Sequence, residues 1–308
     1  MVSAEKNIQV VCFGEVLWDV LPTGKQPGGA PMNVAYHLNR LGISSAVISK
    51  VGSDADGREL LDMLRDIGVS PAFIQTDDRH ATSRVVATIG GDNEVTYDII
   101  APVAWDFLVD EPRCSALVRE AAVLVYGSLA ARNRVSRDTL VQLLDHAAYR
   151  MFDVNLRAPH YTRETVDLLM RYADAVKLNG QELAVVSAWF GNTSGDENTA
   201  VGVLQDRYGL PEIIVTKGAA GASYYCSDAR YDCPAIPVDV ADTVGSGDAF
   251  LAGFLAQKLR GETGDRMLEF ATMLGAYVTT QSGACPPYAQ ADLDRFAWAK
   301  YLERKPLK

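Results

Sequence analysis

The stretch Asp242-Thr243-Val244-Gly245-Ser246-Gly247-Asp248-Ala249-Phe250 decides how this chain is interpreted. It follows a segment typical of strand and turn, residues 231–241, and leads into an apolar segment, residues 249–259, that predicts a helix. A glycine-rich turn at a helix N-terminus directs free backbone N–H groups outward, and the helix dipole adds partial positive charge there. The turn therefore predicts a site for an anion, most often phosphate. A carboxylate at Asp248 is unfavourable beside such a site unless it has a chemical task, such as accepting a proton.

The composition is that of an ordinary globular protein, with 308 residues, 48% apolar and 22% charged. The net charge of −10 disfavours broad binding to nucleic acid or to anionic membranes. Five scattered cysteines without a C-x-x-C pattern indicate neither a disulfide framework nor a zinc site. No basic run precedes an apolar stretch at the N-terminus, and no apolar run is long enough for a membrane span, so we expect a cytoplasmic protein.

Strand-like and helix-like segments alternate along most of the chain, which predicts an α/β fold with a mostly parallel sheet. The strands are expected at residues 8–14, 45–51, 122–126, 150–154, 175–178 and 212–216. The helices are expected at residues 31–41, 56–67, 137–148, 162–172, 180–188, 199–208, 249–259, 265–281 and 291–302. Residues 82–89 and 94–100 flank Gly90-Gly91-Asp92-Asn93, a hairpin signature that predicts a small extra sheet, of the kind that often forms a lid.

Two further segments suit a phosphate-bearing ligand, although the chain has neither a Walker A motif nor a G-x-G-x-x-G motif after a strand. Thr216-Lys217-Gly218-Ala219-Ala220-Gly221 follows a predicted strand, at the sheet edge where ligands of α/β proteins bind. It could equally be only a tight turn. Asn179 and Glu182 open a helix and could hold metal-bound water and phosphate, or simply cap that helix.

Residues suited to a polyhydroxylated ligand occur near the N-terminus. In Gly28-Gly29-Ala30-Pro31-Met32-Asn33, the glycines allow close backbone approach and the Asn33 amide both donates and accepts hydrogen bonds. Asp19 interrupts an apolar run, and sugar hydroxyls could satisfy its carboxylate. Taken singly, Asn33 could be a helix cap and Asp19 a strand end. The four histidines show no metal-ligand spacing, so we expect them to be structural or exposed.

Together these segments resemble the ribokinase-like (PfkB) family of carbohydrate kinases. The two family signatures are present in order, Gly-Gly-x-x-x-Asn at residues 28–33 and Asp-Thr-x-Gly-x-Gly-Asp at residues 242–248. Within the family, residues 14–19, residues 28–33 and Asp153-Val154-Asn155-Leu156-Arg157 are most similar to bacterial fructokinases. The resemblance implies a single kinase domain over residues 1–308. It also implies a three-layer α/β/α fold with a central, mostly parallel sheet and a small β-sheet lid built from about residues 15–30 and 82–101.

The resemblance also implies a role for each matched position. Asp248 is then the catalytic base, and the backbone at Gly245, Ser246 and Gly247 forms the anion hole. The expected sugar-binding positions are Asp19, Gly28, Gly29 and Asn33, and the expected nucleotide-turn positions are Thr216, Gly218 and Gly221. Asn179 and Glu182 match positions linked to Mg²⁺ and phosphate, with Glu182 acting through water. The carbonyl groups of Asp242 and Val244 are candidates for a monovalent cation such as K⁺.

Three positions depart from the family pattern. Ser246 replaces a more usual alanine, which has no consequence if only backbone N–H groups act. Thr272 stands where many members carry an asparagine near the adenine, so it is our candidate for that contact. Leu17 replaces the sugar-binding asparagine of ribokinases, which weighs against ribose.

The implied reaction is transfer of the γ-phosphoryl group of ATP, with Mg²⁺, to a primary hydroxyl, and the expected acceptor is D-fructose. Another sugar, a nucleoside or a sugar acid such as 2-keto-3-deoxygluconate stay open as acceptors, with Arg84 and Arg157 as the candidate cations for a substrate carboxylate. A sugar- or nucleotide-binding sensor on a kinase scaffold is the non-enzymatic alternative, which the intact Asp248, Gly245, Gly247 and Glu182 disfavour. An exposed hairpin edge in the lid also suggests a homodimer.

Overall fold

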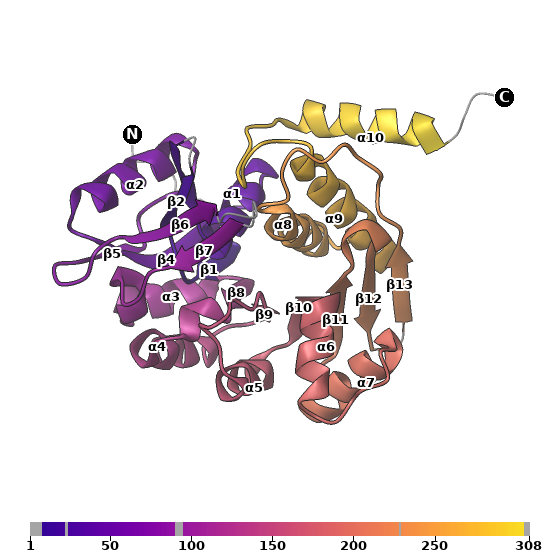
Figure 1. The fold of residues 1–308 in the computed structure, drawn as a ribbon, viewed down its shortest axis with the longest axis horizontal. Coiled ribbons are helices and arrows are strands. Elements are labelled where there is room, and N and C mark those ends of the chain that lie inside the picture. The colour runs from indigo at the N-terminus through magenta and orange to yellow at the C-terminus, as the bar shows by residue number, and fades with distance from the viewer. Residues whose placement is uncertain (1–7, 22–23, 90–94, 228, 305–308) are drawn as a thin grey trace. The chain divides into compact units, whose positions relative to one another are not determined.

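The computed structural model describes residues 8–21, 24–89, 95–227 and 229–304. The chain divides into two compact units (Figure 1). The first consists of Met1–Tyr36 and Ser44–Asp174, and the second of His37–Ile43 and Ala175–Lys308. Helix α1 (Ala30–Arg40) therefore begins in the first unit and ends in the second.

The main sheet of the first unit is parallel throughout, with the strand order β9-β8-β1-β4-β5. Every residue of the central strand β1 is completely buried, as expected for a parallel strand covered on both faces. The strands are β1 (Val10–Phe13), β4 (Ser45–Gly52), β5 (Ile74–Asp77), β8 (Val123–Gly127) and β9 (Arg150–Asp153).

Side-chain caps set where the helices of the first unit begin. Asp54 accepts a hydrogen bond from Gly57 N at 2.7 Å, and Thr162 accepts one from Thr165 N at 3.2 Å. Each cap satisfies an N–H group that has no partner within its helix. In Figure 1, α3, α4 and α5 lie on the same side of the strands of this unit. The helices are α2 (Ala55–Asp66), α3 (Pro112–Glu120), α4 (Arg134–Leu144) and α5 (Arg163–Tyr172), with 3₁₀ turns η1 (Ala104–Phe107) and η2 (Leu129–Ala131).

A separate four-stranded sheet of the first unit has the order β3-β2-β6-β7. Its members are β2 (Leu17–Leu21), β3 (Gly24–Gly28), β6 (Ser83–Ile89) and β7 (Val95–Ile99), from the two chain regions expected to build the small sheet. β6 and β7 pair antiparallel, as the hairpin signature predicts, while the turn expected at residues 90–93 lies outside the described residues. Trp18 anchors the sheet to α2, since it is buried and its Nε1 donates to the carbonyl oxygen of Asp56 at 3.1 Å.

The sheet of the second unit has the order β13-β12-β11-β10, in which only β10 and β11 are parallel. Helices α8 and α9 pack on each other, and a Cβ at Gly253 would lie 3.1 Å from the Cα of Ala271. Residues 249–257 of α8 are all buried, so this helix has apolar residues on every side. The elements are β10 (Ala175–Asn179), α6 (Gly180–Ala188), α7 (Glu197–Tyr208), β11 (Glu212–Thr216), η3 (Gly218–Ala220), β12 (Ala222–Cys226), β13 (Ala229–Cys233), α8 (Ser246–Leu259), α9 (Gly264–Thr279) and α10 (Gln290–Arg304).

The predicted α/β class with a separate small sheet is confirmed, while some elements differ from the prediction. Helix α4 begins at Arg134 rather than at residue 137, because Asn133 caps it. Helix α3 and strand β5 were not predicted from the sequence. The strand expected at residues 231–241 is the shorter β13.

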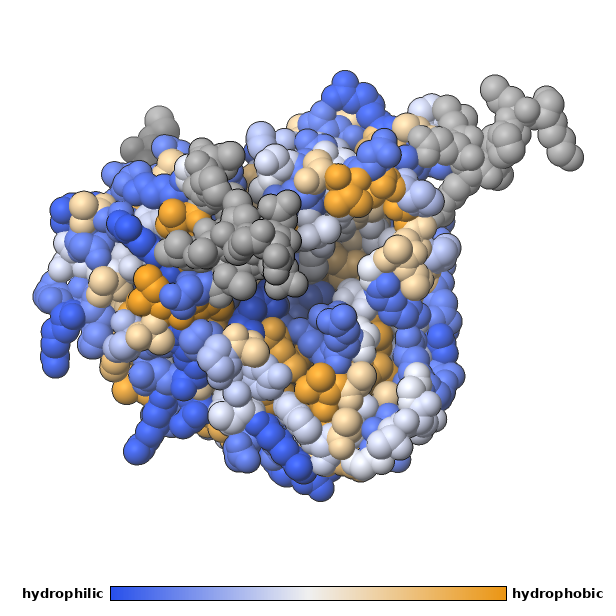
Figure 2. Space-filling view, in the orientation of Figure 1, coloured by the Kyte–Doolittle hydropathy of each residue, from blue (hydrophilic) through white to orange (hydrophobic). Residues whose placement is uncertain are grey.

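The surface carries mainly hydrophilic residues on the face of the first unit seen in Figure 2, with apolar residues in small groups. Such scattered apolar residues are normal for a folded domain. Within the described residues, no helix has both the length and the apolar character needed to cross a membrane.

Candidate functional site

The turn predicted to bind an anion lies at the N-terminus of α8, in the second unit. Gly245 caps this helix with a φ of 75°, in the left-handed region that favours glycine. A Cβ at this position would lie 2.6 Å from the Cα of Ala284. Both the backbone conformation and the close approach of residue 284 therefore require a glycine.

The carboxylate of Asp242 holds the chain that leads into this turn. Its Oδ1 accepts a hydrogen bond from Val244 N at 3.0 Å, and its Oδ2 accepts one from Gly283 N at 3.0 Å. Because both side-chain oxygens accept from backbone groups, the backbone carbonyl is the group of Asp242 that remains a candidate cation ligand.

The first turn of α8 brings N–H donors and a carboxylate together. Ala249 N donates to Gly245 O at 2.8 Å, and the N–H groups that precede it have no acceptor within the helix. Asp248 is half-buried in the same turn. Among these N–H groups, that of Ser246 donates to Thr243 O in the preceding loop at 3.3 Å. The anion site and the role of Asp248 stay predictions.

Lys177 adds a cation that the sequence analysis missed. It lies in β10 between buried Val176 and Leu178 and is itself only 6% exposed. Its Nζ lies 3.5 Å from the point where a Cβ of Gly247 would be. This is an ordinary van der Waals distance, so the ammonium group lies next to residue 247 and brings a full positive charge to the predicted anion-binding turn. The sequence feature that could have pointed to Lys177 is a lysine within an otherwise apolar strand.

His37 supports the segment that packs on Gly245. The imidazole is completely buried, with Nε2 2.9 Å from Ala284 O and Nδ1 2.9 Å from the hydroxyl of Tyr288. A carbonyl oxygen can only accept, so Nε2 carries the proton and Nδ1 accepts from the tyrosine hydroxyl. Burial lowers the pKa of His37 to about 4, which keeps the ring neutral. The expectation of a structural histidine is met at this position.

Asn179 and Glu182 form a capping box at the start of α6. Asn179 Oδ1 accepts from Glu182 N at 2.9 Å, and Glu182 Oε2 accepts from Asn179 N at 2.8 Å. The capping interpretation is therefore correct for these two residues. The Glu182 oxygen that takes part in the capping box is Oε2.

The second predicted phosphate turn is tight and depends on glycine. Gly218 and Gly221 have φ values of 53° and 93°, and a Cβ at Gly221 would lie 2.1 Å from Cys233 O. Thr216 ends β11 directly before this turn. In the same unit, the Oγ1 of Thr272 on α9 is buried without a hydrogen-bond partner among the described residues. An unsatisfied buried hydroxyl is costly, which is consistent with a ligand that completes it.

The predicted sugar-binding residues lie together in the first unit. A Cβ at Gly28 would lie 2.1 Å from Asp19 Oδ2, so glycine at position 28 makes room for this carboxylate. Gly29 has a φ of 113°, and a Cβ there would lie 2.4 Å from Glu15 O. Asn33 is buried in the first turn of α1, and its N–H donates to Gly29 O at 2.9 Å.

Asp19 has the electrostatics of a binding group. Burial raises its pKa to about 6, and the positive charge of Arg157 partly opposes that shift. Perturbed carboxylates of this kind are concentrated at functional sites. Arg157 belongs to an exposed segment after β9, where Asn155 has a φ of 39°. The structure therefore brings Arg157 into the field of Asp19, as a shared role requires.

Arg84 differs in position from the other residues that were predicted to bind the substrate. It pairs in register with Trp18 across β2 and β6, so it lies on the opposite face of the small sheet from Asp19. Its guanidinium forms an ion pair with Asp56 of α2. The geometry thus gives Arg84 a role in holding the small sheet on α2.

The second unit alone, with an anion-binding turn, a buried lysine and a carboxylate, has the features of an α/β phosphotransferase. The chain belongs to the PfkB family of carbohydrate kinases, whose family model matches residues 2–291. A probable fructokinase-7 from Arabidopsis thaliana is 31% identical to it over 326 residues, which cover 94% of this chain and 92% of that protein.

Solved structures agree with this family membership. A fructokinase from Vibrio cholerae O395, in a form bound to fructose, ADP and calcium ion, matches with a TM-score of 0.80 and 27% identity over 94% of this chain and 99% of that one. An aminoimidazole riboside kinase from Salmonella enterica, complexed with aminoimidazole riboside and an ATP analog, matches with a TM-score of 0.79 and 25% identity over the same shares of the two chains. The predicted three-layer α/β/α ribokinase-like fold is confirmed.

Proposed function

We propose that this carbohydrate kinase transfers the γ-phosphoryl group of ATP to the primary hydroxyl of D-fructose, giving fructose 6-phosphate and ADP. The observation that carries the reaction is the turn at residues 242–248, where helix N–H donors and the Asp248 carboxylate share one helical turn. The preference for fructose is supported by the relatives named fructokinase.

In the proposed mechanism, Asp248 accepts the hydroxyl proton while the new O–P bond forms and the bond to ADP breaks. A positioned base of this kind contributes a factor of about 10²–10⁴ to the rate. The transition state of phosphoryl transfer is loose, so proton transfer comes late and a carboxylate of ordinary basicity suffices.

The backbone N–H groups of Gly245, Ser246 and Gly247 stabilise the charge on the transferring phosphoryl group. A single preorganised donor of this type is worth on the order of 3 kcal/mol. The Lys177 ammonium adds a full charge beside residue 247, and its burial limits screening by solvent. The serine hydroxyl of Ser246 has no task in this scheme.

The nucleotide end consists of the turn at Thr216, Gly218 and Gly221 together with Thr272, whose buried hydroxyl would gain a partner. Glu182 is our candidate for Mg²⁺ bound through water, because Mg²⁺ sites combine few carboxylates with water and substrate phosphates. Mg²⁺ would neutralise charge on the phosphate oxygens of ATP. We also propose K⁺ at the carbonyl groups of Asp242 and Val244, which predicts that replacing K⁺ by a bulky organic cation lowers activity.

The sugar end consists of Asp19, Gly28, Gly29 and Asn33, with the positive charge of Arg157 acting on the Asp19 carboxylate. A carboxylate and an amide offer acceptors and a donor for a row of hydroxyl groups. The glycines remove side chains that would otherwise fill the space next to Asp19 Oδ2.

An ADP-release assay across fructose, glucose, ribose, 2-keto-3-deoxygluconate and adenosine tests the acceptor. We expect fructose to give the highest kcat/KM. A clear preference for the sugar acid would assign Arg157 to its carboxylate, and a preference for adenosine would move the protein to the nucleoside kinases of the family. ADP release with none of them, although ligand binds, would support the sensor alternative.

The two units act, in this proposal, as one kinase domain, because the family match runs through both. The edge strands of the small sheet, β3 and β7, are the candidate contacts of a homodimer, since an exposed edge can pair with another chain. Light scattering behind size-exclusion chromatography tests this, with a mass of twice the 33.4 kDa chain expected.

A further inference from the structure

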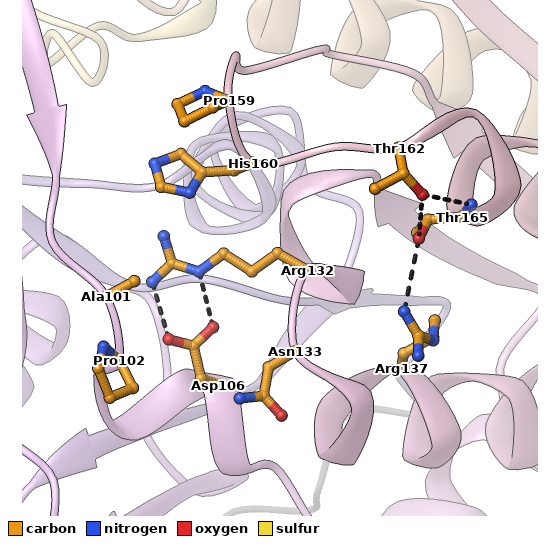
Figure 3. A pocket seen from close by; sticks show the side chains of 10 residues that line it. All are labelled: Ala101, Pro102, Asp106, Arg132, Asn133, Arg137, Pro159, His160, Thr162 and Thr165. Carbon is orange, nitrogen blue, oxygen red and sulfur yellow. Dashed lines mark hydrogen bonds and ion pairs between the residues drawn. The ribbon is translucent and has the colours of Figure 1, made fainter.

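A cavity of about 460 Å³ opens in the first unit (Figure 3), and its lining includes none of the residues proposed above for sugar or nucleotide. It adjoins one of them, because the backbone N–H of the lining residue His160 donates to Arg157 O at 2.7 Å. It is surrounded by the first residues of helices α4 and α5 and by the loop residues Pro159 and His160. Its volume lies within the range of small-molecule sites. The cavity is therefore large enough for a hexose-sized ligand, and the side chains around it determine which kind.

One wall is a rigid, neutralised ion pair. Arg132 donates two hydrogen bonds to Asp106, from Nε at 2.7 Å and from an Nη at 2.8 Å, and both side chains are almost fully buried. The Arg132 guanidinium also lies over the ring of Trp105, 4.0 Å from its centroid. The pair fixes the shape of this wall while contributing little net charge.

The opposite wall carries a guanidinium that is not neutralised. Arg137 makes a single long contact, 3.4 Å from an Nη to the hydroxyl of Thr165. No carboxylate among the described residues lies within ion-pair distance of it. Figure 3 shows the Arg137 side chain across the cavity from the Arg132–Asp106 pair.

His160 and three uncharged polar side chains also line the cavity, together with Ala101, Pro102 and Pro159. Asn133 and Thr162 are the caps of α4 and α5, so the positive ends of both helix dipoles meet the cavity. Burial and the charge of Arg132 lower the pKa of His160, while the carboxylates Asp106 and Asp98 act in the opposite direction. The cavity thus offers a positive potential, and hydroxyl and amide groups for hydrogen bonds.

We propose that this cavity is a second ligand site that binds a phosphorylated sugar, with the phosphate at Arg137 and the sugar hydroxyls at Asn133, Thr162 and Thr165. An arginine fork suits phosphate oxygens, and an unpaired guanidinium gains most from a dianion. The proposal does not depend on the reaction assigned above, because none of these residues takes part in it.

Binding at this site can be followed through His160, because the chain has only four histidines and their imidazole NMR signals can be told apart. The test is a titration of isotope-labelled full-length protein with glucose 6-phosphate, followed by two-dimensional NMR of the imidazole groups at constant pH and ionic strength. His160→Gln assigns the resonance. We expect the His160 signal to shift saturably, while the signal of buried His37 stays in place.

Matched variants locate the phosphate. Arg137→Gln should weaken the apparent affinity at least about tenfold, whereas Arg134→Gln on the same helix, where Arg134 pairs with exposed Asp138, should titrate like the wild type. An unchanged His37 signal in both variants shows that the fold is intact. Inorganic phosphate alone tests the anion without the sugar, and weaker binding than glucose 6-phosphate is expected.

Three results would overturn the proposal. One is a His160 signal that does not move with either phosphate compound. The second is an Arg137→Gln variant that titrates like the wild type. The third is an equal shift with gluconate, which carries a carboxylate but no phosphate.

Discussion

Asp248 is the residue on which the proposed reaction depends, since it shares the first turn of α8 with N–H groups that favour an anionic substrate. We expect Asp248→Asn to lower kcat by about 10²–10⁴-fold, because the amide cannot accept the proton. The Kd of ATP should change little. Steady-state kinetics and nucleotide titration measure the two effects.

The matched control for that variant is Asp265→Asn, which removes an exposed carboxylate from the first turn of the next helix, α9. Its kcat should equal that of the wild type. If Asp248→Asn retained a near wild-type kcat, the role of catalytic base would have to go to another group.

The proposed role of Asp19 predicts that the binding of sugar depends on pH. Its pKa is raised to about 6 by burial, so the carboxylate is charged above pH 6 and becomes protonated below it. A protonated carboxyl loses an acceptor for sugar hydroxyls, so the KM for sugar should rise as the pH falls through 6. Arg157→Gln removes the opposing charge and should move this inflection to higher pH. Initial rates from pH 5 to 8 measure both curves.

The control for Arg157 is Arg65→Gln, an exposed arginine on α2 that pairs with Asp62. Its KM profile should overlay that of the wild type. A KM that is flat between pH 5 and 8 in the wild type would mean that Asp19 does not bind the sugar in its charged form.

His37 couples stability to acid. Its pKa is about 4 in the folded chain and about 6.5 when unfolded, so between these values the unfolded state binds the extra proton. The free energy of unfolding therefore falls as the pH drops from 6.5 to 4, by about 3 kcal/mol from this residue. Urea denaturation at pH 7 and pH 4 should show a smaller loss in His37→Gln than in the wild type. His146→Gln, a substitution at the half-buried histidine that follows α4, should lose as much as the wild type does.

At the scale of elements, the turn before α8 shows how one glycine couples a helix N-terminus to a distant segment of the same unit. Gly245 and Gly261 lie near the two ends of α8 with nearly equal φ values, 75° and 77°. A Cβ at Gly261 would meet nothing within 4 Å, whereas one at Gly245 would meet Ala284. The two positions therefore separate backbone strain from loss of the packing contact.

We expect Gly261→Ala to cost about 1–2 kcal/mol of stability, the strain of a left-handed alanine, and to leave kcat unchanged. Gly245→Ala should cost more and should also reduce kcat, because the turn must shift away from residue 284. Chemical denaturation and steady-state assays of both variants measure the difference. Equal effects of the two substitutions would show that the Ala284 contact has no importance for the site.

The sequence predicts elements well where the apolar pattern is strong and poorly where tertiary contacts decide. The strands around β1 and the anion-binding turn follow from local sequence alone. Helix α3 starts at Pro112 without a side-chain cap hydrogen bond, and the four-residue strand β5 is too short to show a period. Lys177 and the cavity around Arg137 were missed for a different reason, since their neighbours come from distant parts of the chain.

At the scale of the whole molecule, the proposed roles divide between the two units. The sugar-end residues, from Asp19 to Arg157, belong to the first unit, and Lys177, Asp248 and the nucleotide turn belong to the second. In this proposal, the nucleotide binds to residues of the second unit and the acceptor to residues of the first. Phosphoryl transfer to sugar then requires both ligands, and water is the competing acceptor whenever sugar is absent.

ADP release without sugar tests this requirement. Holding the acceptor in the reactive geometry supplies about 7–11 kcal/mol of the barrier reduction in such reactions. A water molecule that is not held in that geometry reacts without this contribution. We therefore expect ADP release without sugar to be at least about 10³-fold slower than with saturating sugar. Asp19→Asn at subsaturating sugar should approach the sugar-free rate while its ATP affinity stays that of the wild type. Equal rates with and without sugar would mean that the chain hydrolyses ATP irrespective of an acceptor, and the residues of the first unit would then have no part in the reaction.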